Sequence, residues 1–230
     1  LGVIVAFGGL IREPLLSAPR LGWINLHFSL LPAYRGAAPV QRAIMAGDTR
    51  TGMSVFRLTA GLDEGDLLAQ RPHPIGAHDT AGSLLERLAA DGAELVADVV
   101  DRLTAGTAEA TPQSGEPSFA PKLTREDGRI VFAAGADAQA LSALVCGVTP
   151  EPGAFAEFDD DTVVKLLEVA IAHDAPALAP GQLAIAEGRA LVGTGGRPLE
   201  LLRVQPAGKQ AMRAIDWMRG LRELAERRFR

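Results

Sequence analysis

Several features that mark particular protein classes are scarce in this chain. It contains one cysteine, Cys146, so no disulfide can form within the chain, and we expect a reducing compartment, the cytoplasm. No apolar run approaches the roughly 20 residues that a membrane-spanning helix needs. The opening residues lack the charged region and cleavage pattern of a signal peptide. The sequence therefore does not predict a membrane protein or a disulfide-stabilised secreted protein.

A large excess of one charge is also missing. The chain has 23 Lys and Arg against 28 Asp and Glu, and a formal net charge of −5 argues against indiscriminate nucleic-acid binding. The distribution is uneven, because residues 197–230 carry 9 basic and 4 acidic side chains. Such segments are usually solvated helix faces, and a minority of them bind phosphates.

The composition is globular, with 47% hydrophobic residues in a chain of 230, enough for one large domain or two ordinary ones. Residues 3–6 are rich in Val and Ile without alternation, which is typical of a parallel strand buried on both faces. Such a strand needs neighbours, and almost nothing precedes it. We therefore expect the chain to be a fragment cut within a domain, and to be poorly folded or inactive by itself.

Periodicity and turn residues predict the other elements. In the first part we expect a turn at 7–9, helices at 14–16, 39–46 and 80–103, and extended segments at 23–27, 53–58 and 67–71. The small, polar residues of 111–121 indicate a linker. In the second part we expect helices at 136–145 and 212–228, and short strands at 154–158, 162–172, 182–186, 190–193 and 199–204. Short strands at this spacing favour a small barrel.

The most informative stretch is residues 25–36, NLHFSLLPAYRG. If residues 23–27 form a strand, alternation places Asn25 and His27 side by side. Pro32 cannot continue a strand, so a loop follows. An amide and an imidazole at the end of a strand suit a reaction site. They equally suit a core strand whose two polar side chains are simply hydrogen-bonded, and the pattern alone leaves both interpretations open.

Extended along the chain, this motif resembles the folate-dependent formyltransferases. The resemblance rests on Asn25-Leu-His27, Ser29-Leu-Leu-Pro32, Arg35-Gly-Ala-Ala-Pro39, Gly47-Asp48, Thr51-Gly52 and Gly61-Leu-Asp-Glu-Gly-Asp66. Three further runs resemble the members of this family that act on initiator tRNA: Ala120–Thr124 with Arg129-Ile130, Pro150–Ala154, and Gln205–Lys209 leading to Met212 and Asp216-Trp217. The resemblance covers essentially the whole chain, and implies that about the first third of the family's chain is absent.

This resemblance implies an α/β fold and a reaction. A partial Rossmann-like catalytic domain would occupy residues 1–110, followed by a linker at 111–121 and a small OB-like β-barrel at 122–230 that helps to hold tRNA. The implied reaction transfers a formyl group from 10-formyltetrahydrofolate to the α-amine of methionyl-initiator tRNA. No metal is implied, and we expect a monomer.

The resemblance also assigns roles to individual residues. Asn25 would donate to the developing oxyanion, His27 would be a second donor or a proton carrier, and Asp63 would orient His27 or pass protons through water. The residues implied to contact folate are Ser29, Leu30, Leu31 and Pro32. Those implied to contact tRNA are Arg35, Lys122 and Lys209. For the two leucines the alternative is simple packing, and for the lysines it is an ordinary surface position.

Other functions remain open from the sequence. The acceptor of the formyl group could be a sugar nucleotide or a purine precursor, although the linker and barrel argue against the purine enzyme. From a different class, the chain could be an inactive folate- or RNA-binding fragment. A metal site is not favoured, because His73 and His78 lie five residues apart in a loop without a carboxylate partner.

Overall fold

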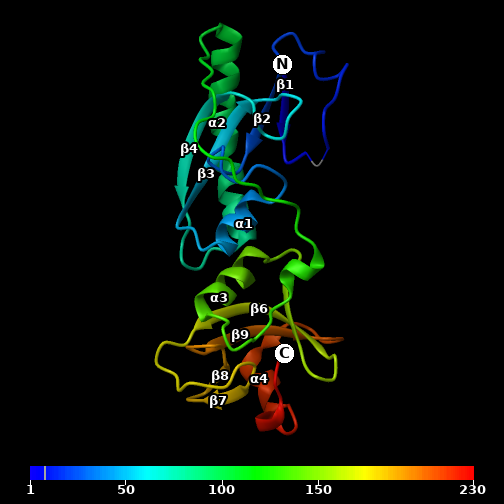
Figure 1. Cartoon of the computed structure of the whole chain (residues 1–230), viewed down its shortest axis with the longest axis vertical. Coiled ribbons are helices and arrows are strands. Elements are labelled where there is room, and N and C mark those ends of the chain that lie inside the picture. Colours follow the sequence, from blue (N-terminus) through cyan, green and yellow to red (C-terminus); the bar gives the residue numbers. More distant parts are fainter. Residues whose placement is uncertain (8) are drawn as a thin grey trace. The chain divides into compact units, whose positions relative to one another are not determined.

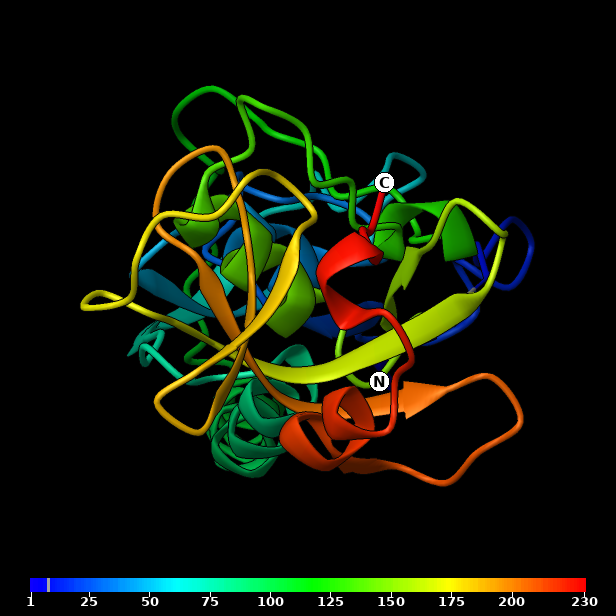
Figure 2. The ribbon, with the colours of Figure 1, turned by 90° about the horizontal axis from the view of Figure 1, so that it is seen from below.

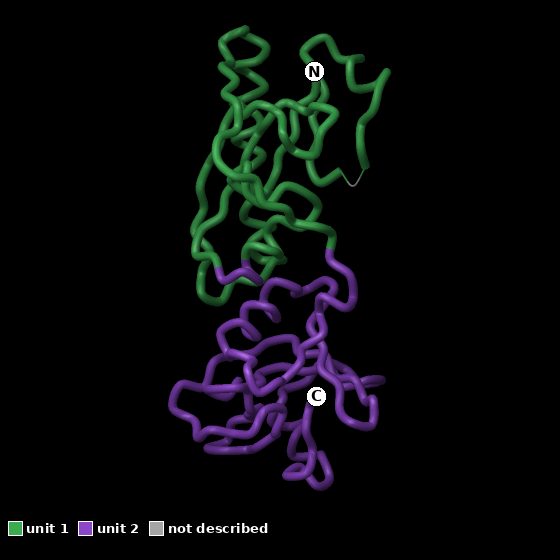
Figure 3. The backbone as a smooth tube through the Cα atoms, viewed as in Figure 1, with its two compact units in different colours: residues 1–43, 48–122 green, residues 44–47, 123–230 purple. Residues whose placement is uncertain are grey.

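The computed structural model describes residues 1–7 and 9–230, which form two compact units. Unit 1 comprises residues 1–43 and 48–122, and unit 2 comprises residues 44–47 and 123–230 (Figure 3). The predicted turn at 7–9 includes Gly8, which lies outside the described residues. Over the described part of the chain, no helix is both long enough and apolar enough to cross a membrane.

Unit 1 contains a four-stranded sheet in the order β1-β2-β3-β4 (Figure 1). Its strands are β1 (Gly2–Val5), β2 (Trp23–His27), β3 (Arg50–Arg57) and β4 (Leu67–Pro74). β1 runs parallel to β2, and the other neighbours are antiparallel. The predicted strand at 23–27 and the Rossmann-like character of this unit are thereby confirmed.

The prediction that β1 is buried on both faces is wrong. Val3 and Val5 are 45% and 48% exposed, whereas Ile4 between them is 8% exposed. The physical reason is that α2 packs on β3 and β4 and does not extend over β1, so the face that carries Val3 and Val5 stays uncovered. β1 also lies at the edge of the sheet, with β2 as its partner. An uncovered apolar edge strand is prone to pair with other chains.

Two helices accompany this sheet, α1 (Pro39–Met45) and α2 (Ala81–Ala105). α2 begins at a capping box formed by Thr80 and Ser83 and ends at Gly106, whose φ is +73°. The helix packs closely on the sheet, because a side-chain carbon added at Gly92 would lie 2.6 Å from Leu26. The buried residues of α2 repeat every three or four positions, as predicted: Leu84, Leu88, Leu95, Val99 and Leu103.

The helix predicted at residues 14–16 is absent. That segment forms one isolated turn, closed by the Leu16 N–H donating to the Arg12 carbonyl over 3.0 Å. Pro19 follows closely, and a proline has no N–H with which to continue a helix.

Unit 2 is an antiparallel sheet in the order β5-β6-β9-β8-β7, with β10 paired to β9. The strands are β5 (Ala154–Glu157), β6 (Val163–Ile171), β7 (Leu183–Ala186), β8 (Arg189–Val192), β9 (Leu199–Pro206) and β10 (Met212–Arg213). Isolated bridges join Arg228 to Gln182 and Phe229 to Phe158, so the C-terminal segment links the two ends of the sheet. This closure agrees with the predicted small barrel (Figure 2).

An aromatic cluster fills one part of the core of unit 2. Phe229 stacks on Phe158 with 4.5 Å between ring centroids, on Phe132 at 5.6 Å and on Trp217 at 6.2 Å. All four side chains are buried. The cluster therefore fixes the segment that closes the sheet.

Four short helices complete unit 2 and the region before it. They are the 3₁₀ helix η1 (Arg125–Gly128), α3 (Ala138–Gly147), α4 (Ala214–Arg219) and the 3₁₀ helix η2 (Leu224–Glu226). The long final helix predicted at 212–228 is therefore wrong. α4 ends at Gly220, and Glu223 adopts a left-handed conformation with φ +53°, which breaks the helix before the segment returns to the sheet.

Candidate active site

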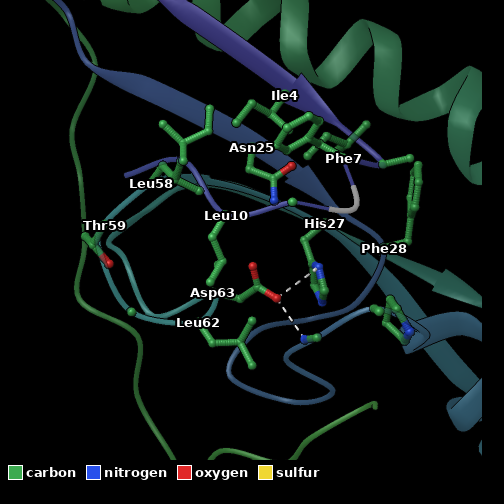
Figure 4. Close-up of a pocket in the computed structure, with 18 of the residues that line it drawn as sticks. Ile4, Phe7, Leu10, Asn25, His27, Phe28, Leu58, Thr59, Leu62 and Asp63 are labelled. Carbon is green, nitrogen blue, oxygen red and sulfur yellow. Dashed lines mark hydrogen bonds and ion pairs between the residues drawn. The ribbon is translucent and has the colours of Figure 1, made fainter. Parts of the chain in front are cut away.

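A cavity of about 510 Å³ lies in unit 1, between the end of β2 and the loops that follow β1 and β3 (Figure 4). Its wall is mainly apolar, with a few polar side chains among the apolar ones. The apolar residues include Ile4, Phe7, Leu10, Ile11, Leu58 and Leu62. The polar ones are Asn25, His27, Gln41, Thr59 and Asp63. An apolar cavity with a few convergent polar groups is the usual form of a small-molecule site.

Asn25 enters this cavity from β2. Its position opposite Phe56 in the sheet and its alternation with buried Ile24 and Leu26 turn the amide toward the cavity, as Figure 4 shows. Within the described residues, the Asn25 Oδ1 is one of three buried side-chain polar atoms without a hydrogen-bond partner. Because buried polar groups are almost always paired, an unpaired amide at a cavity wall is typical of a group kept for a ligand.

His27 is buried two residues further along β2, with 6% of its surface exposed. Its Nε2 lies 2.9 Å from the backbone carbonyl oxygen of Tyr34. A carbonyl only accepts, so Nε2 must carry the hydrogen and donate it. In the neutral ring the Nδ1 lone pair is then free, and it faces the Asp63 carboxylate at 3.7 Å.

The loop that holds His27 in this form is itself anchored. Tyr34 has a φ of +59°, and its hydroxyl donates to the Asp48 carboxylate over 2.7 Å. Partial burial, together with the bond to Asp48, raises the pKa of Tyr34 to about 12. The hydroxyl therefore stays protonated near neutral pH, and the Tyr34 carbonyl keeps its place beside His27.

Asp63 comes from the loop after β3, far from β2 in the sequence. Its Oδ2 accepts a hydrogen bond of 2.7 Å from the Gly36 N–H and faces the His27 ring (Figure 4). Its φ is +48°, a conformation that side-chain-bearing residues rarely adopt and that clusters at functional sites. The structure thus brings Asn25, His27 and Asp63 to one cavity, while their individual roles stay predictions.

We expect activity to depend on neutral His27. Burial lowers the pKa of His27 below its ordinary value of 6.5, and the Asp63 charge and the Tyr34 carbonyl only partly oppose that shift. Protonation would occupy the free Nδ1, so the rate should fall as pH drops through this lowered value, with no fall between pH 8 and 7. Measuring kcat/KM against pH tests this. A fall that begins above pH 7 would contradict it.

The loop residues Ser29–Pro32 follow His27 and make contacts within the protein. Among the described residues that line the cavity, none of these four appears. Ser29 and Leu31 are buried at 0% and 3% exposure, and the Ser29 hydroxyl donates to the Ala33 carbonyl over 2.6 Å. These contacts shape the loop between His27 and Tyr34. Their predicted contact with folate stays a prediction.

A buried hydroxyl on β3 supports the same loop. Ser54 Oγ donates to the Ser29 carbonyl over 2.7 Å and accepts from the Leu31 N–H over 3.1 Å, and the Gln70 amide donates to it over 2.9 Å. Ser54 is fully buried, so water cannot replace these bonds. The loop conformation therefore depends on this side chain.

Replacing Ser54 by alanine should lower the free energy of unfolding by about 1–3 kcal/mol, because the buried Leu31 N–H loses its acceptor. Urea titration followed by circular dichroism measures the change. Ser114 is exposed, so Ser114→Ala is the matched control and should change stability by less than about 0.5 kcal/mol. Equal stability of both variants would contradict the supporting role of Ser54.

The three residues predicted to contact tRNA differ in exposure. Lys122 and Lys209 are exposed, and Lys209 follows Gly208, whose φ of +71° forms a turn after β9. Arg35 is half-buried, and its guanidinium donates to the side-chain oxygen of Gln113 from Nη2 over 2.6 Å and from Nε over 3.2 Å. Contacts between these residues and tRNA stay predictions.

Sequence reasoning missed the apolar wall of the cavity. Phe7, Leu10 and Leu62 are 61%, 65% and 47% exposed, and they stand in or beside glycine-containing loops. Large apolar side chains in such loops were the available signal, because a loop without a ligand has no reason to expose them. Over residues 1–7 and 9–230, no group of three or more His, Cys, Asp or Glu side chains is placed to hold a metal ion.

The chain is similar in sequence to a known protein family. The model of the formyl transferase domain matches residues 1–100, and that of the formyl transferase C-terminal domain matches residues 122–222. A protein of Clavibacter sepedonicus named methionyl-tRNA formyltransferase is 55% identical over 221 residues. That match covers 96% of this chain and 72% of the relative, so this chain is shorter than its relative.

Solved structures share the fold at low identity. HypX from Aquifex aeolicus, in complex with tetrahydrofolic acid, has a TM-score of 0.73 at 17% identity, covering 94% of this chain and 38% of HypX. The N-formyltransferase from Helicobacter canadensis, in complex with folinic acid and dTDP-3-aminofucose, has a TM-score of 0.62 at 18% identity, covering 80% of this chain and 65% of that one. With both of its domain models matched in order, the chain belongs to the formyl transferase family.

Proposed function

We propose that this chain holds the groups that transfer the formyl group of 10-formyltetrahydrofolate to the α-amine of methionyl-initiator tRNA in translation initiation. The expectation that the chain is poorly folded or inactive by itself stays a prediction, and the assay described below tests it. The observation that carries this proposal is the grouping of Asn25, His27 and Asp63 at one cavity, with an unpaired amide and a free imidazole nitrogen. The 55% identical relative that is named methionyl-tRNA formyltransferase supports the choice of acceptor.

The reaction asks two things of the protein. The amine nitrogen forms a bond to the formyl carbon, the bond from that carbon to the folate nitrogen breaks, and one proton passes from the amine to the folate nitrogen. The formyl oxygen gains negative charge on the way, and the Asn25 amide would donate a hydrogen bond to it. The free Nδ1 of His27 would take the proton from the amine, and Asp63 would stabilise the imidazolium that results.

The residues present fit a folate donor. The apolar wall formed by Ile4, Phe7, Leu10 and Leu62 would contact a flat heteroaromatic ring and exclude water from the reacting groups. The bound donor supplies the carbonyl carbon that is attacked. Asn25 and His27 line the same cavity, where they would meet that carbon.

The tRNA would contact basic side chains. Arg35 directly precedes Gly36, which lines the cavity and donates to Asp63. Lys122 and Lys209 are exposed candidates, and residues 197–230 carry 9 basic against 4 acidic side chains. Because initiator tRNA is charged and used in the cytoplasm, we place the protein there, and we propose that it acts as a monomer.

The competing acceptor is an amino sugar on a nucleotide. The likeness to the Helicobacter canadensis enzyme supports the shared fold and carries no argument about the acceptor. The match of residues 122–222 to the formyl transferase C-terminal domain and the basic side chains of residues 197–230 favour tRNA.

A direct assay separates the two acceptors. Purified protein is incubated with 10-formyltetrahydrofolate and either methionyl-initiator tRNA or a dTDP-linked amino sugar, and formylated product is measured by mass spectrometry. Formyl-methionyl-tRNA is expected from a protein extended to the length of the Clavibacter sepedonicus relative, with little product from this chain by itself and none when the donor is omitted. Formylation of the amino sugar alone would overturn the proposed acceptor. If the extended protein forms no product with either acceptor, the proposed function is overturned.

A further inference from the structure

The stretch predicted as a linker forms a strap, defined here as residues 111–120, that is bonded across unit 1. At its start, Thr111 exchanges two backbone hydrogen bonds with Leu67, the first residue of β4, over 2.8 and 2.9 Å. Leu67 directly follows the loop that carries Asp63. The strap is therefore fixed beside one of the loops of the candidate site.

The end of the strap is fixed to the other loop. Arg35 donates from its backbone N–H to the Ser118 carbonyl and accepts from the Ala120 N–H, each over 2.8 Å. The Tyr34 N–H also donates to the Ser118 hydroxyl over 2.9 Å. The approach is close, because a side-chain carbon added at Gly36 would lie 2.7 Å from the Ala120 carbonyl oxygen.

Between these anchors, Gln113 is the strap residue whose side chain turns inward. It is half-buried, whereas the other strap residues except Ala120 are exposed. Its amide nitrogen donates to the carbonyl oxygens of Asp63, over 2.7 Å, and Gly65, over 2.9 Å. Its amide oxygen accepts from Arg35. Carbonyls only accept and a guanidinium only donates, so these partners fix the orientation of the amide and use both its hydrogens.

We propose that Gln113 is a positioning residue for formyl transfer, which sets the place of Asp63 against His27 by tying the Asp63 loop to the loop of Arg35 and Gly36. The Asp63 backbone is in the left-handed region, a conformation that persists only where surrounding contacts hold it. Gln113 supplies such contacts at the Asp63 carbonyl, while the Gly36 N–H holds its carboxylate. The two loops thus reach His27 as one bonded assembly.

Gln113 acts through other residues, because among the described residues that line the cavity it does not appear. The inference rests on the proposed function for its kinetic consequence. Its structural consequence, the position of Asp63 relative to His27, can be measured without any substrate. The proposed function and the positioning role of Gln113 can therefore be contradicted independently of each other.

The test uses two variants of the full chain and a control. Gln113→Ala removes all four hydrogen bonds, and Gln113→Met removes them while keeping the length of the side chain, which leaves a testable protein if the alanine variant folds poorly. Gln139 is exposed on α3, so Gln139→Ala is the matched control. We expect kcat for formyl-methionyl-tRNA to fall about ten- to a hundred-fold in both Gln113 variants, as for a misplacement of about 1 Å, with a smaller change in KM.

The second readout is the pKa of His27, measured by NMR titration and assigned with a His27→Asn variant. Asp63 is the charged group whose field raises the pKa of His27, and the Tyr34 carbonyl is its other polar neighbour. Displacing Asp63 should therefore lower the pKa of His27 below that of the wild-type protein. Gln139→Ala should leave it unchanged.

Each outcome decides the inference. A drop in kcat with a lowered His27 pKa in both Gln113 variants supports it. An unchanged His27 pKa overturns it, whether or not kcat falls, since a purely structural role would leave that pKa in place. If the wild-type protein, extended to the length of the Clavibacter sepedonicus relative, forms no formyl-methionyl-tRNA, the proposed function fails, and the His27 titration alone decides the role of Gln113.

Discussion

Replacing Asn25 by alanine is expected to lower kcat for formyl transfer by about 10²–10³-fold, the usual effect of removing one oxyanion donor. The amide stands at the cavity wall with its oxygen unpaired, so its truncation breaks no hydrogen bond at that oxygen. Stability should therefore change far less than the rate. Steady-state formylation of methionyl-tRNA, with thermal unfolding measured on the same samples, tests both expectations.

Two further variants sharpen this test. Asn25→Asp keeps the shape of the side chain but replaces the donating NH₂ with an oxygen, so it should be at least as slow as Asn25→Ala. Gln139→Ala removes an exposed amide on α3 and should leave kcat within about two-fold of wild type. Near-normal turnover of Asn25→Asp would show that Asn25 is not the oxyanion donor.

The largest loss of stability is expected from Phe229→Ala. Phe229 is 3% exposed and stacks against Phe132, Phe158 and Trp217. Truncating a buried phenylalanine costs about 3–5 kcal/mol. The same ring also anchors the segment that joins β5 to β7, so its loss should open the sheet as well as leave a cavity.

Urea unfolding followed by Trp217 fluorescence measures this effect, with Trp23→Phe as the background so that only unit 2 reports. Arg228 is exposed next to Phe229 and bridges Gln182 through its backbone, so Arg228→Ala is the matched control. It should change the free energy of unfolding by less than about 0.5 kcal/mol. A loss below 1 kcal/mol for Phe229→Ala would show that the cluster does not hold the sheet closed.

Much of the fold follows from local patterns in the sequence. The strand at 23–27 and the helix at 80–103 carry clear periodicity, and their buried faces are those that the pattern indicates. The same alternation placed Asn25 and His27 on one face of a strand. Asp63 was assigned to the site only through the family resemblance. It is a left-handed residue in a loop far from β2, and hydrophobic periodicity does not predict the position of such a residue.

Other features depend on contacts that no local pattern records. The apolar residues near the C-terminus fit a helix over 212–228, yet Gly220 and the left-handed Glu223 divide that segment so that Phe229 can join the core. Gln113 was hidden in a stretch whose small and polar residues are typical of a linker. The proposed role of Gln113 depends on the hydrogen bonds that it makes to loops about 50 and 78 positions away in the sequence.

The strap also determines when the loop beside His27 can become ordered during synthesis on the ribosome. Tyr34 and its partner Ser118 are separated by 84 positions. At a synthesis rate of roughly 5–20 residues per second, the loop beside His27 is made roughly 4–17 s before the segment that fixes it. During that interval β2 can pair with β3, but the loop lacks its final hydrogen bonds. The loop beside His27 is therefore translated well before the segment that completes its hydrogen bonds.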